Sequence, residues 1–492
     1  MPADGQGPSR GETDPPASRP APYLLLAGVL LVLVPVRAAI GPIRDIDLYW
    51  HLLVGRDLLH GVAPAQAGRG WSFAPVADTW VSTQWLAEAA FAQLELWGGL
   101  PALVLLRTLT VVAALAVLAC VTLVRRPVRS GIWPFTIGAL AISMSAEERS
   151  QQVTFILAPL VGWWLERLVR EGRVPRAWVL LPLVVVWANV HGGWVLLPIA
   201  LTLGALARVL DHGWRDRSAA AALMLAIGCT AMATISPSGL ENITAVRRFA
   251  ASTAIVLEWQ RVSLDDVTVI PLVLIAATII VAWARGRARP SRGEIVVVGV
   301  LLVFATLAWR NVTPSVLALT PIATGILSRA LGEPDPSRER PALARTTIAL
   351  GAFGAVVGIV VSLAPQQVVD RSVPLGLLHT LAETTSEQRV LDNYNVSGPL
   401  LWFAGPPPHV VVGVDGRADR YGPAYLDRYL DTLAARAGWE VQVDALAPTA
   451  ALLHRDDALV GVLVAQRHWV EVGREADYVL LHAPDAPGWP SA

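Results

Sequence analysis

Residues 41–61 read GPIRDIDLYWHLLVGRDLLHG, and the chain is organised around the loop that this stretch opens. The loop runs over residues 41–100 and lies between two strongly apolar runs. It nevertheless carries several carboxylates and histidines, among them Asp45, Asp47 and His51. Carboxylates held just past the end of a membrane span cost free energy and usually mark function. We therefore predict that the rest of the chain places this loop at one face of a membrane.

The composition predicts a polytopic α-helical membrane protein. Hydrophobic residues make up 54% of the chain and charged residues only 16%, and the mean hydropathy is +0.50. A span needs about 20 apolar residues, and apolar runs close to that length recur along most of the chain. About eleven transmembrane helices are predicted, at residues 21–40, 101–124, 131–145, 152–169, 177–189, 192–210, 218–236, 267–284, 293–309, 313–331 and 345–364. The lipid bilayer is thus an expected partner, and with a formal net charge of zero we expect no nucleic acid.

The composition also divides the chain into three parts. Residues 1–20 are rich in Pro, Gly and Ser without an apolar face, which is typical of a disordered tail. Residues 21–364 form the predicted transmembrane domain, including the loop 41–100. Residues 365–492 have the pattern of a soluble α/β domain that is large enough for its own core. Its strands are predicted near residues 389–393, 409–414, 450–454, 469–472 and 478–481, and its helices near 425–437 and 456–466.

Arginines in the connections between spans decide the predicted orientation. With eleven spans, the arginine-rich connections all fall on one side, which the positive-inside rule makes cytoplasmic. These arginines are Arg125, Arg126, Arg129, Arg167, Arg170, Arg173, Arg176, Arg208, Arg215, Arg217, Arg285, Arg287, Arg289, Arg292, Arg329, Arg338, Arg340 and Arg345. The N-terminal tail is then cytoplasmic, and the loop 41–100 and the C-terminal domain lie outside the plasma membrane.

Asp45 and Asp47 stand two residues apart, just outside the first predicted span. A carboxylate here can act as a general base that deprotonates a hydroxyl, or it can bind a divalent metal such as Mg²⁺ or Mn²⁺. Asp47 can equally be the N-cap of a helix predicted over residues 47–60, a purely structural role. His51 follows four residues after Asp47, and its presence favours a functional site in which His51 binds substrate.

The residues around this pair resemble the GT-C glycosyltransferase superfamily of membrane proteins. The resemblance rests on Asp45-x-Asp47, Tyr49-Trp50-His51-Leu52, Gly55, Ser82, Trp85-Leu86 and Glu88. Later segments extend it: Trp187-Ala188-Asn189-Val190-His191-Gly192-Gly193, Glu258-Trp259 and Asp415-Gly416-Arg417-Ala418-Asp419-Arg420-Tyr421. The chain is also distantly similar to the catalytic subunit of oligosaccharyltransferase, whose first outer loop carries an Asp ahead of an aromatic-rich helix. The chain departs from the superfamily pattern Asn-Pro-x-Gly at Ser236-Pro237-Ser238-Gly239.

This resemblance implies a polyprenyl-phosphate-linked sugar donor and a catalytic acidic residue in the first outer loop. It makes Asp47 the first candidate for that residue and Asp45 the second. It also implies inversion at the anomeric carbon, but it leaves the acceptor open among an envelope glycan, a lipid and a protein. GT-C enzymes with monophosphate donors generally work without a metal, whereas the residues themselves leave a divalent metal open.

A second outer loop carries Glu147, Glu148 and Arg149, which are predicted to bind substrate. The arginine suits the phosphate of a donor, and Glu147 can share a metal with Asp47. The three residues can also be a solvated cap between two spans. Arg107 lies one or two turns inside its span, where it either snorkels to the surface or holds the donor phosphate.

The remaining predicted substrate-binding residues are Asn189, His191, Glu258, Arg310, Asp415 and Arg417. Asn189 and His191 stand at a Gly-Gly break inside an apolar stretch, and non-helical backbone at membrane depth is tolerated where it lines a cavity. A tight turn with a hydrogen-bonded histidine is the alternative. Asp415 and Arg417 either contact the acceptor or form a salt bridge that orders the C-terminal domain.

Together these features predict a membrane glycosyltransferase that moves a sugar from a polyprenyl-phosphate donor to an extracytoplasmic acceptor hydroxyl in cell-envelope glycan assembly. A transporter or flippase of lipid-linked glycans is one alternative, but it would need polar residues strung through the bilayer and broken helices in both halves. The polar residues here cluster at one face. A non-catalytic membrane protein that binds envelope polymers is the other alternative.

Overall fold

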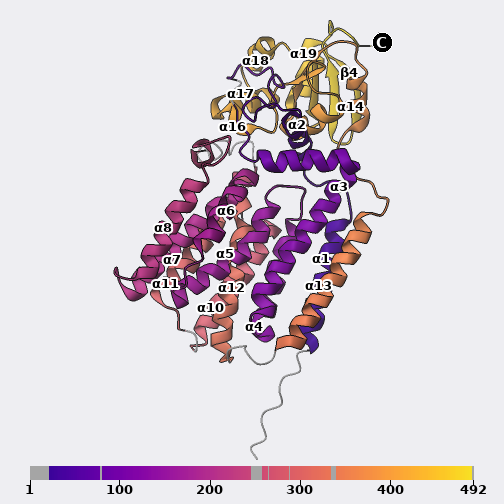
Figure 1. Ribbon diagram of the computed structural model, residues 1–492. Coiled ribbons are helices and arrows are strands. Elements are labelled where there is room, and N and C mark those ends of the chain that lie inside the picture. Colours follow the sequence, from indigo (N-terminus) through magenta and orange to yellow (C-terminus); the bar gives the residue numbers. More distant parts are fainter. Residues whose placement is uncertain are drawn as a thin grey trace, which may run out of the picture.

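The computed structural model describes residues 21–77, 80–244, 257–263, 265–286, 289–333 and 340–489. The predicted tail, residues 1–20, lies outside these ranges. Each of the eleven predicted spans coincides with a helix: α1 (Ala21–Ala39), α3 (Trp85–Ala119), α4 (Val128–Met144), α5 (Gln152–Glu171), α6 (Ala177–Val190), α7 (Leu196–His212), α8 (Arg217–Met232), α10 (Ile270–Ala284), α11 (Arg292–Leu307), α12 (Val312–Leu331) and α13 (Arg340–Ser362). These helices form a bundle, and the C-terminal domain sits on one end of it (Figure 1).

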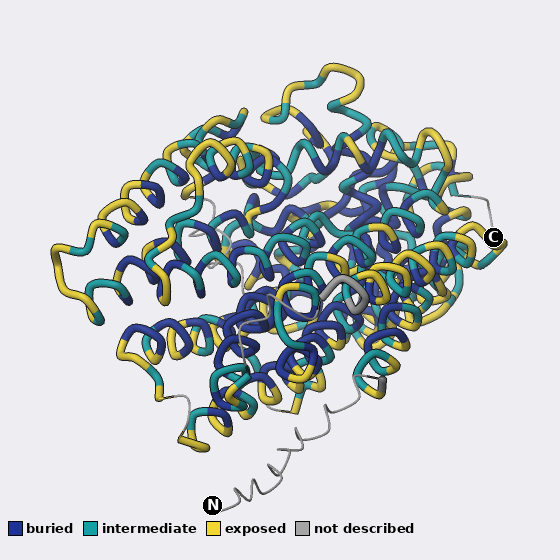
Figure 2. The backbone as a smooth tube through the Cα atoms, turned by 60° about the horizontal axis from the view of Figure 1, so that its bottom comes forward, coloured by how far each residue is buried: buried dark blue, intermediate teal, exposed yellow. Residues whose placement is uncertain are grey.

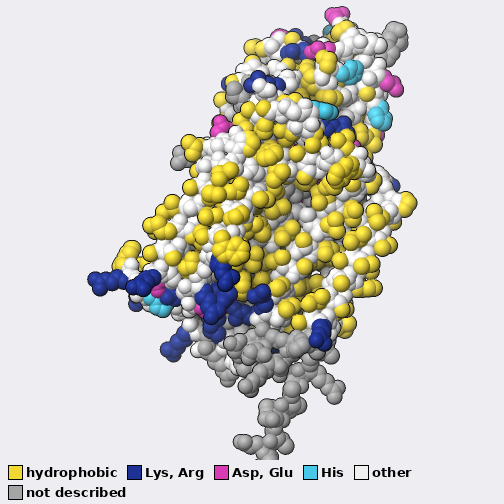
Figure 3. Space-filling view, viewed as in Figure 1, with side chains coloured by type: hydrophobic (Ala, Val, Ile, Leu, Met, Phe, Trp, Pro, Cys, Tyr) yellow, Lys and Arg dark blue, Asp and Glu magenta, His cyan; other side chains and the backbone are white. Residues whose placement is uncertain are grey.

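The bundle has the surface and the helix lengths of a multi-pass membrane protein. Hydrophobic side chains cover most of the face of the bundle that Figure 3 shows. Six described helical segments are long and apolar enough to cross a bilayer: Pro22–Ala39, Trp85–Val124, Gly192–His212, Val267–Ala284, Trp309–Leu331 and Ala344–Ser362. The other predicted spans are helices that are shorter or more polar, so the number of eleven crossings stays a prediction.

Helix α12 lies at the centre of the bundle, where every residue from 312 to 326 is buried. It packs against α4, α5 and α10. A Cβ added to Gly162 of α5 would lie 2.0 Å from the carbonyl oxygen of Ala318, so the two helix backbones touch there. Small residues allow such close packing, which drives helix association where lipid surrounds the helices. Figure 2 shows the result, with buried residues inside the bundle and exposed ones on its outer faces and ends.

Arginine side chains of the described residues gather at the end of the bundle away from the C-terminal domain (Figure 3). Arg126, which precedes α4, forms an ion pair with Glu166 of α5, and Arg170 contacts the same carboxylate. Arg329 near the end of α12 pairs with Glu294 near the start of α11. The helices therefore alternate in direction as predicted, with arginines at one end and the carboxylate-rich loop at the other.

The loop 41–100 folds into helices at that second end, and the first of them lies close to the predicted range 47–60. Helix α2 (Leu48–Leu59) follows Asp47, and the first part of α3 begins at Trp85. Gly99, at a φ of +65°, interrupts α3, and Pro101 starts its second part. Only glycine adopts this backbone conformation without strain. Figure 1 shows the first part of α3 lying across the end of the bundle and the second part running down through it.

The C-terminal domain contains one five-stranded sheet in the order β2-β1-β3-β5-β4. Its strands, β1 (Gln388–Asp392), β2 (Val410–Val412), β3 (Ala450–His454), β4 (Val470–Glu475) and β5 (Tyr478–His482), lie at the predicted places. The first three strands are parallel, and β5 and β4 are antiparallel additions. The two predicted helices are α17 (Pro423–Leu433) and α19 (Ala458–Arg467). Four further helices of this domain were not predicted because they are too short to show a helical period: α14 (Leu375–Ala382), α15 (Ser397–Phe403), α16 (Ala418–Tyr421) and α18 (Trp439–Leu446).

Part of the loop 41–100 belongs to the core of this C-terminal domain. The backbone N–H of Val412 in β2 donates to the carbonyl oxygen of Trp71 at 2.8 Å. The backbone N–H of Phe73 donates to the carbonyl oxygen of Val412 at 3.1 Å. The loop therefore extends the sheet beyond β2. Trp50 of α2 packs in the same hydrophobic cluster as Leu400 of α15. These contacts fix the loop, and the carboxylates it carries, against the C-terminal domain.

Candidate active site

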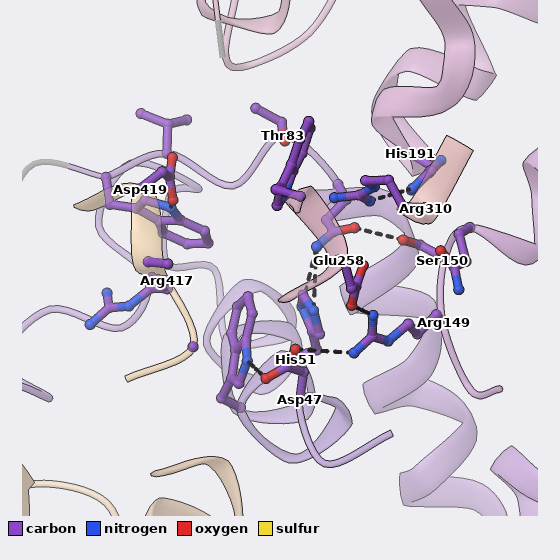
Figure 4. Close-up of a pocket in the computed structure, with 18 of the residues that line it drawn as sticks. Asp47, His51, Thr83, Arg149, Ser150, His191, Glu258, Arg310, Arg417 and Asp419 are labelled. Carbon is purple, nitrogen blue, oxygen red and sulfur yellow. Dashed lines mark hydrogen bonds and ion pairs between the residues drawn. The ribbon is translucent and has the colours of Figure 1, made fainter. Parts of the chain in front are cut away.

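A polar cavity of about 120 Å³ lies between the end of the bundle and the C-terminal domain. It is lined by α2, the connections α4–α5 and α6–α7, the short turn η3 (Leu257–Trp259), the region before α12, and the turns that follow β1 and β2. Figure 4 shows Arg310 and His191 on one side of it and Arg417 and Asp419 on the other. The cavity brings together seven of the predicted site residues: Asp47, His51, Arg149, His191, Glu258, Arg310 and Arg417.

Arg149 contacts four carboxylates at or next to this cavity. Its Nε lies 2.7 Å from Oδ2 of Asp45, and its Nη2 lies 3.3 Å from Oδ2 of Asp47. It also forms an ion pair with Glu258 of η3 (Figure 4), and its Nε lies 3.5 Å from Oε2 of Glu147. One guanidinium with five donors can satisfy several carboxylates at once. Arg149 thus holds three separate segments of the chain together.

The structure distinguishes the two aspartates of the first loop. The side chain of Asp45 is only 1% exposed, whereas that of Asp47 is 29% exposed and lines the cavity. Asp47 occupies the N-cap position of α2, as one alternative predicts, but its side chain makes no capping hydrogen bond; Trp50 Nε1 donates to its Oδ1 at 3.3 Å instead. Burial, together with the neighbouring Asp45, raises the pKa of Asp47. Asp47 is therefore the aspartate that faces the cavity, and Asp45 is the buried one that contacts Arg149.

His51 is held by a buried carboxylate whose role the sequence analysis did not assign. Its Nδ1 lies 2.8 Å from Oε1 of Glu88, and the hydroxyl of Ser82 donates to Oε2 of Glu88 at 2.5 Å. Ser150 donates to Oε1 of Gln84, which directs the amide nitrogen of Gln84 towards His51 Nε2 at 3.4 Å. A carboxylate on Nδ1 fixes the orientation of the ring. Glu88 appears in the sequence motif, but the motif alone does not show this contact.

His191 and Arg310 present two donors to the cavity. Nδ1 of His191 accepts a hydrogen bond from the backbone N–H of Gly193 at 2.9 Å, so the proton of the neutral ring lies on Nε2. Nη2 of Arg310 lies 3.4 Å from this Nε2. Two N–H groups cannot bond to each other, but both can donate to an anion that lies between them. The Arg310 guanidinium also stacks 4.5 Å from the ring centroid of Trp259.

A second cavity, of about 780 Å³, opens from the same place into the helical bundle. Its walls are largely apolar, with Phe155, Leu196, Phe304, Leu307 and Pro314 among the lining residues. It shares six residues with the polar cavity: Thr83, Gln84, Gln151, His191, Trp259 and Arg310. The paired donors of His191 and Arg310 therefore stand where the polar and the apolar cavities meet.

Two further predicted sites have partners inside the protein. Oδ1 of Asn189 accepts from Trp85 Nε1 at 2.6 Å, and its amide donates to the carbonyl oxygen of Ile235, so Asn189 ties α6 to α3. Asp415 receives two hydrogen bonds from the Arg417 side chain, at 2.9 and 2.6 Å. The internal salt bridge predicted as one alternative for this pair is therefore formed, although Arg417 also lines the cavity.

Glu147 and Glu148, in the α4–α5 connection, are not among the residues that line the polar cavity. Oε1 of Glu148 pairs with Arg107 at 2.5 Å, and both side chains are buried. Arg107 thus neither snorkels to the surface nor lines the polar cavity. Glu147 lines a separate cavity of about 240 Å³ beside α3, together with Arg149.

The carboxylates predicted to share a metal do not fit a metal site as they stand. Asp47 and Glu147 both face the guanidinium of Arg149, which supplies the positive charge that a metal would bring. Among the described residues, no three His, Cys, Asp or Glu side chains are grouped so that they could hold a metal ion. A divalent metal stays a prediction of the sequence.

Glu147 should make the stability of the protein depend on pH. Burial raises the pKa of Glu147 from 4.5 to about 7, against the opposing effect of Arg149. Between these two values the folded chain binds more protons than the unfolded chain, so stability falls as the pH rises through this window. We expect Glu147→Gln to lose this dependence. The unfolding temperature of Glu147→Gln, relative to that of the wild type, should therefore rise as the pH increases from about 5 to about 8. Thermal unfolding in detergent checks this, and a constant difference across the range would contradict it.

Comparison with known proteins gives matches among solved structures alone. No family model matches the chain, and no curated protein matches it. The crystal structure of ArnT from Cupriavidus metallidurans bound to undecaprenyl phosphate superposes with a TM-score of 0.50 and 15% identity, covering 96% of this chain and 99% of that chain. The apo state of the same protein gives a TM-score of 0.48 and 16% identity, with the same coverage.

A third match is the arabinofuranosyltransferase AftD from mycobacteria, as the mutant R1389S. Its TM-score is 0.40 at 16% identity, and the alignment covers 96% of this chain and 42% of AftD. The likeness to ArnT bound to undecaprenyl phosphate runs through both the helical bundle and the C-terminal domain, because it covers nearly all of both chains. At this identity it concerns the fold alone. The chain therefore shares the fold of this ArnT structure, in which a helical membrane bundle carries a C-terminal α/β domain, as the sequence predicts.

Proposed function

We propose that the chain is a membrane glycosyltransferase that moves a sugar from a polyprenyl-phosphate donor to an extracytoplasmic acceptor hydroxyl in the assembly of cell-envelope glycans. ArnT, which has the same fold, was solved with undecaprenyl phosphate bound, and this supports a donor of that kind. In the proposed orientation the arginine-rich end of the bundle and the N-terminus are cytoplasmic. The polar cavity and the C-terminal domain then lie outside the plasma membrane.

The junction between the two cavities is the observation that carries this proposal. A polyprenyl phosphate has a long apolar tail and an anionic head, so it needs an apolar cavity that ends at cationic or donor groups. The apolar cavity of about 780 Å³ ends at Arg310 and His191, and Asp47 lines the polar cavity beyond them. A transporter would need polar groups distributed through the bilayer. The polar groups described here instead lie together at one end of the bundle, which favours transfer over transport.

In the proposed inverting transfer, the residues around the junction have separate roles. The guanidinium of Arg310 and the Nε2–H of His191 hold the donor phosphate. The acceptor oxygen attacks the anomeric carbon from the side opposite the phosphate, while Asp47 takes the hydroxyl proton. The bond between the anomeric carbon and the phosphate oxygen breaks, and its electron pair leaves on the phosphate as polyprenyl phosphate. The neighbouring positive charge stabilises the phosphate as its charge grows.

We propose that this transfer needs no metal. Arg149 and Arg310 bring the positive charge that a divalent ion would otherwise supply, and Arg149 already contacts Asp47 and Glu147. Transfer by the purified protein is therefore expected to persist in excess EDTA. Loss of transfer on chelation, with recovery in Mg²⁺ or Mn²⁺, would instead assign Asp47 and Glu147 to a metal.

Arg310→Gln is expected to weaken the binding of undecaprenyl phosphate by about 10- to 100-fold. This range corresponds to the loss of one hydrogen bond to a charged group, worth about 1.5–3 kcal/mol. The measurement is the affinity of the full-length protein in lipid nanodiscs for undecaprenyl phosphate. Arg292→Gln is the matched control, because Arg292 is exposed at the start of α11, at the other end of the bundle. Equal affinities for all three proteins would remove Arg310 from the donor site.

A further inference from the structure

The polar cavity has a part that the donor junction does not include. Thirteen of its lining residues are not shared with the apolar cavity: Asp47, Trp50, His51, Trp80, Val81, Arg149, Ser150, Glu258, Tyr394, Gly416, Arg417, Ala418 and Asp419. We call the part formed by Trp50, Trp80, Tyr394, Arg417 and Asp419 the roof, because the C-terminal domain and the loop 41–100 contribute it. Figure 4 shows Arg417 and Asp419 of the roof on the side of the cavity opposite Arg310 and His191.

The roof combines aromatic rings with a carboxylate. Trp80 Nε1 donates to Oδ1 of Asp419 at 3.0 Å, which fixes the indole next to the carboxylate. The rings of Trp50 and Trp80 meet edge to face, with centroids 6.1 Å apart. Tyr394 adds a third ring, and its hydroxyl donates to the carbonyl oxygen of Gly416 at 3.2 Å. The roof thus offers both apolar ring surface and polar groups within one small space.

The packing of the C-terminal domain keeps the roof in place. Arg417 is buried and bonded to Asp415, and its guanidinium lies 4.9 Å from the Trp71 ring and 5.5 Å from the Trp80 ring. A Cβ at Gly416 would lie 1.9 Å from Trp50 Nε1, so this turn and α2 are in direct contact. Tyr394 and Arg417 follow β1 and β2, whose parallel strands end at the same edge of the sheet. Ligands commonly bind at that edge of an α/β sheet.

We infer that the roof is a subsite for a sugar ring of the acceptor, so that the acceptor is a saccharide. A sugar ring has a face of C–H groups that packs on aromatic rings, and a rim of hydroxyls that bonds to carboxylates and guanidinium groups. A lipid alcohol would need apolar walls without these charges, and an extended peptide would need a groove with free strand edges. This inference rests on the proposed function, because Asp47, which lines the same cavity, takes the proton of the bound hydroxyl.

Saturation-transfer NMR on the full-length protein in nanodiscs tests this inference. The probes are a panel of glucose, galactose, mannose, arabinose and their disaccharides, with a serine-containing tripeptide and farnesol as competing classes. We expect at least one saccharide to receive saturation from the wild type, and this signal to fall at least fivefold in Trp80→Ala and in Asp419→Asn. Trp214→Ala is the matched control, because Trp214 is 90% exposed in the α7–α8 connection, away from the cavity.

Binding of undecaprenyl phosphate is measured on the same samples, so that the two proposals fail separately. Unchanged lipid binding with loss of the saccharide signal in Trp80→Ala supports the subsite. Asp419→Asn keeps the size of the Asp419 side chain. If Trp80→Ala does not fold, the saccharide signal of Asp419→Asn tests the subsite instead. Saturation of the tripeptide or farnesol without any saccharide, or an equal loss in Trp214→Ala, overturns the saccharide subsite. Saccharide binding that depends on Trp80 without any binding of undecaprenyl phosphate would leave the subsite standing and overturn the donor assignment.

Discussion

Asp47→Asn is expected to lower the rate of sugar transfer by about 10²- to 10⁴-fold, which is the usual contribution of a general base. Asparagine keeps the shape of the side chain and can still accept the hydrogen bond from Trp50 Nε1, but it cannot take up a proton. Burial and the adjacent Asp45 raise the pKa of Asp47, which makes its carboxylate a stronger base than an exposed aspartate. The affinity for undecaprenyl phosphate should stay unchanged, because Arg310 and His191, rather than Asp47, stand at the junction with the apolar cavity.

The test in cells compares a strain without the gene, complemented with the wild type or with Asp47→Asn. Mass spectrometry of polyprenyl-linked sugars and envelope glycans should show one lipid-linked sugar accumulating and one glycan lost, in the mutant as in the deletion. Asp45→Asn is the control, and we expect a smaller loss because Asp45 acts through Arg149. Normal transfer in Asp47→Asn with none in Asp45→Asn would exchange their roles. A phenotype of the deletion alone would favour the transporter or the polymer-binding protein.

The helices of the bundle could be predicted closely because the bilayer imposes its requirement residue by residue. A run of apolar side chains is visible in the sequence whatever it later packs against, and the predicted run 152–169 became α5 with nearly the same bounds. Gly99 and Pro101, where α3 bends, are local signals of the same kind, since backbone chemistry decides that position. The alternation of arginine-rich connections carried the same kind of local information.

The contacts that build the site could not be predicted in the same way, because they join segments far apart in the chain. Motifs placed Glu88 and His51 in one loop, but only folding shows that Glu88 holds the ring. The backbone hydrogen bond between Trp71 and Val412 joins residues more than three hundred positions apart, and no local sequence pattern predicts it. The family resemblance ranked Asp47 before Asp45, but their difference in exposure, 29% against 1%, is visible only in the folded chain.

Arg107→Met is expected to destabilise the protein by about 3–5 kcal/mol, the usual cost of removing one partner of a buried ion pair. The side chain of Arg107 is 0% exposed and that of Glu148 is 1% exposed. Arg107 also donates to the carbonyl oxygens of Ala38 in the last turn of α1 and of Pro42 just beyond it, at 2.6 and 2.9 Å. Methionine would leave the Glu148 carboxylate without its cation and these carbonyl groups without their donor. Thermal unfolding of the purified protein in detergent measures the loss.

The double mutant Arg107→Met/Glu148→Gln separates the two contributions. Removing the carboxylate charge should recover part of the stability lost in Arg107→Met, because no uncompensated buried charge remains. Arg474→Met is the matched control: its pair with Glu471 is exposed, and such pairs contribute little to stability. An Arg107→Met protein that unfolds like the wild type but no longer binds undecaprenyl phosphate would restore the alternative in which Arg107 holds the donor phosphate. Loss of stability with lipid binding retained in the folded fraction would instead show that this arginine joins α1, α3 and the second outer loop, and so supports the loop that carries Asp47.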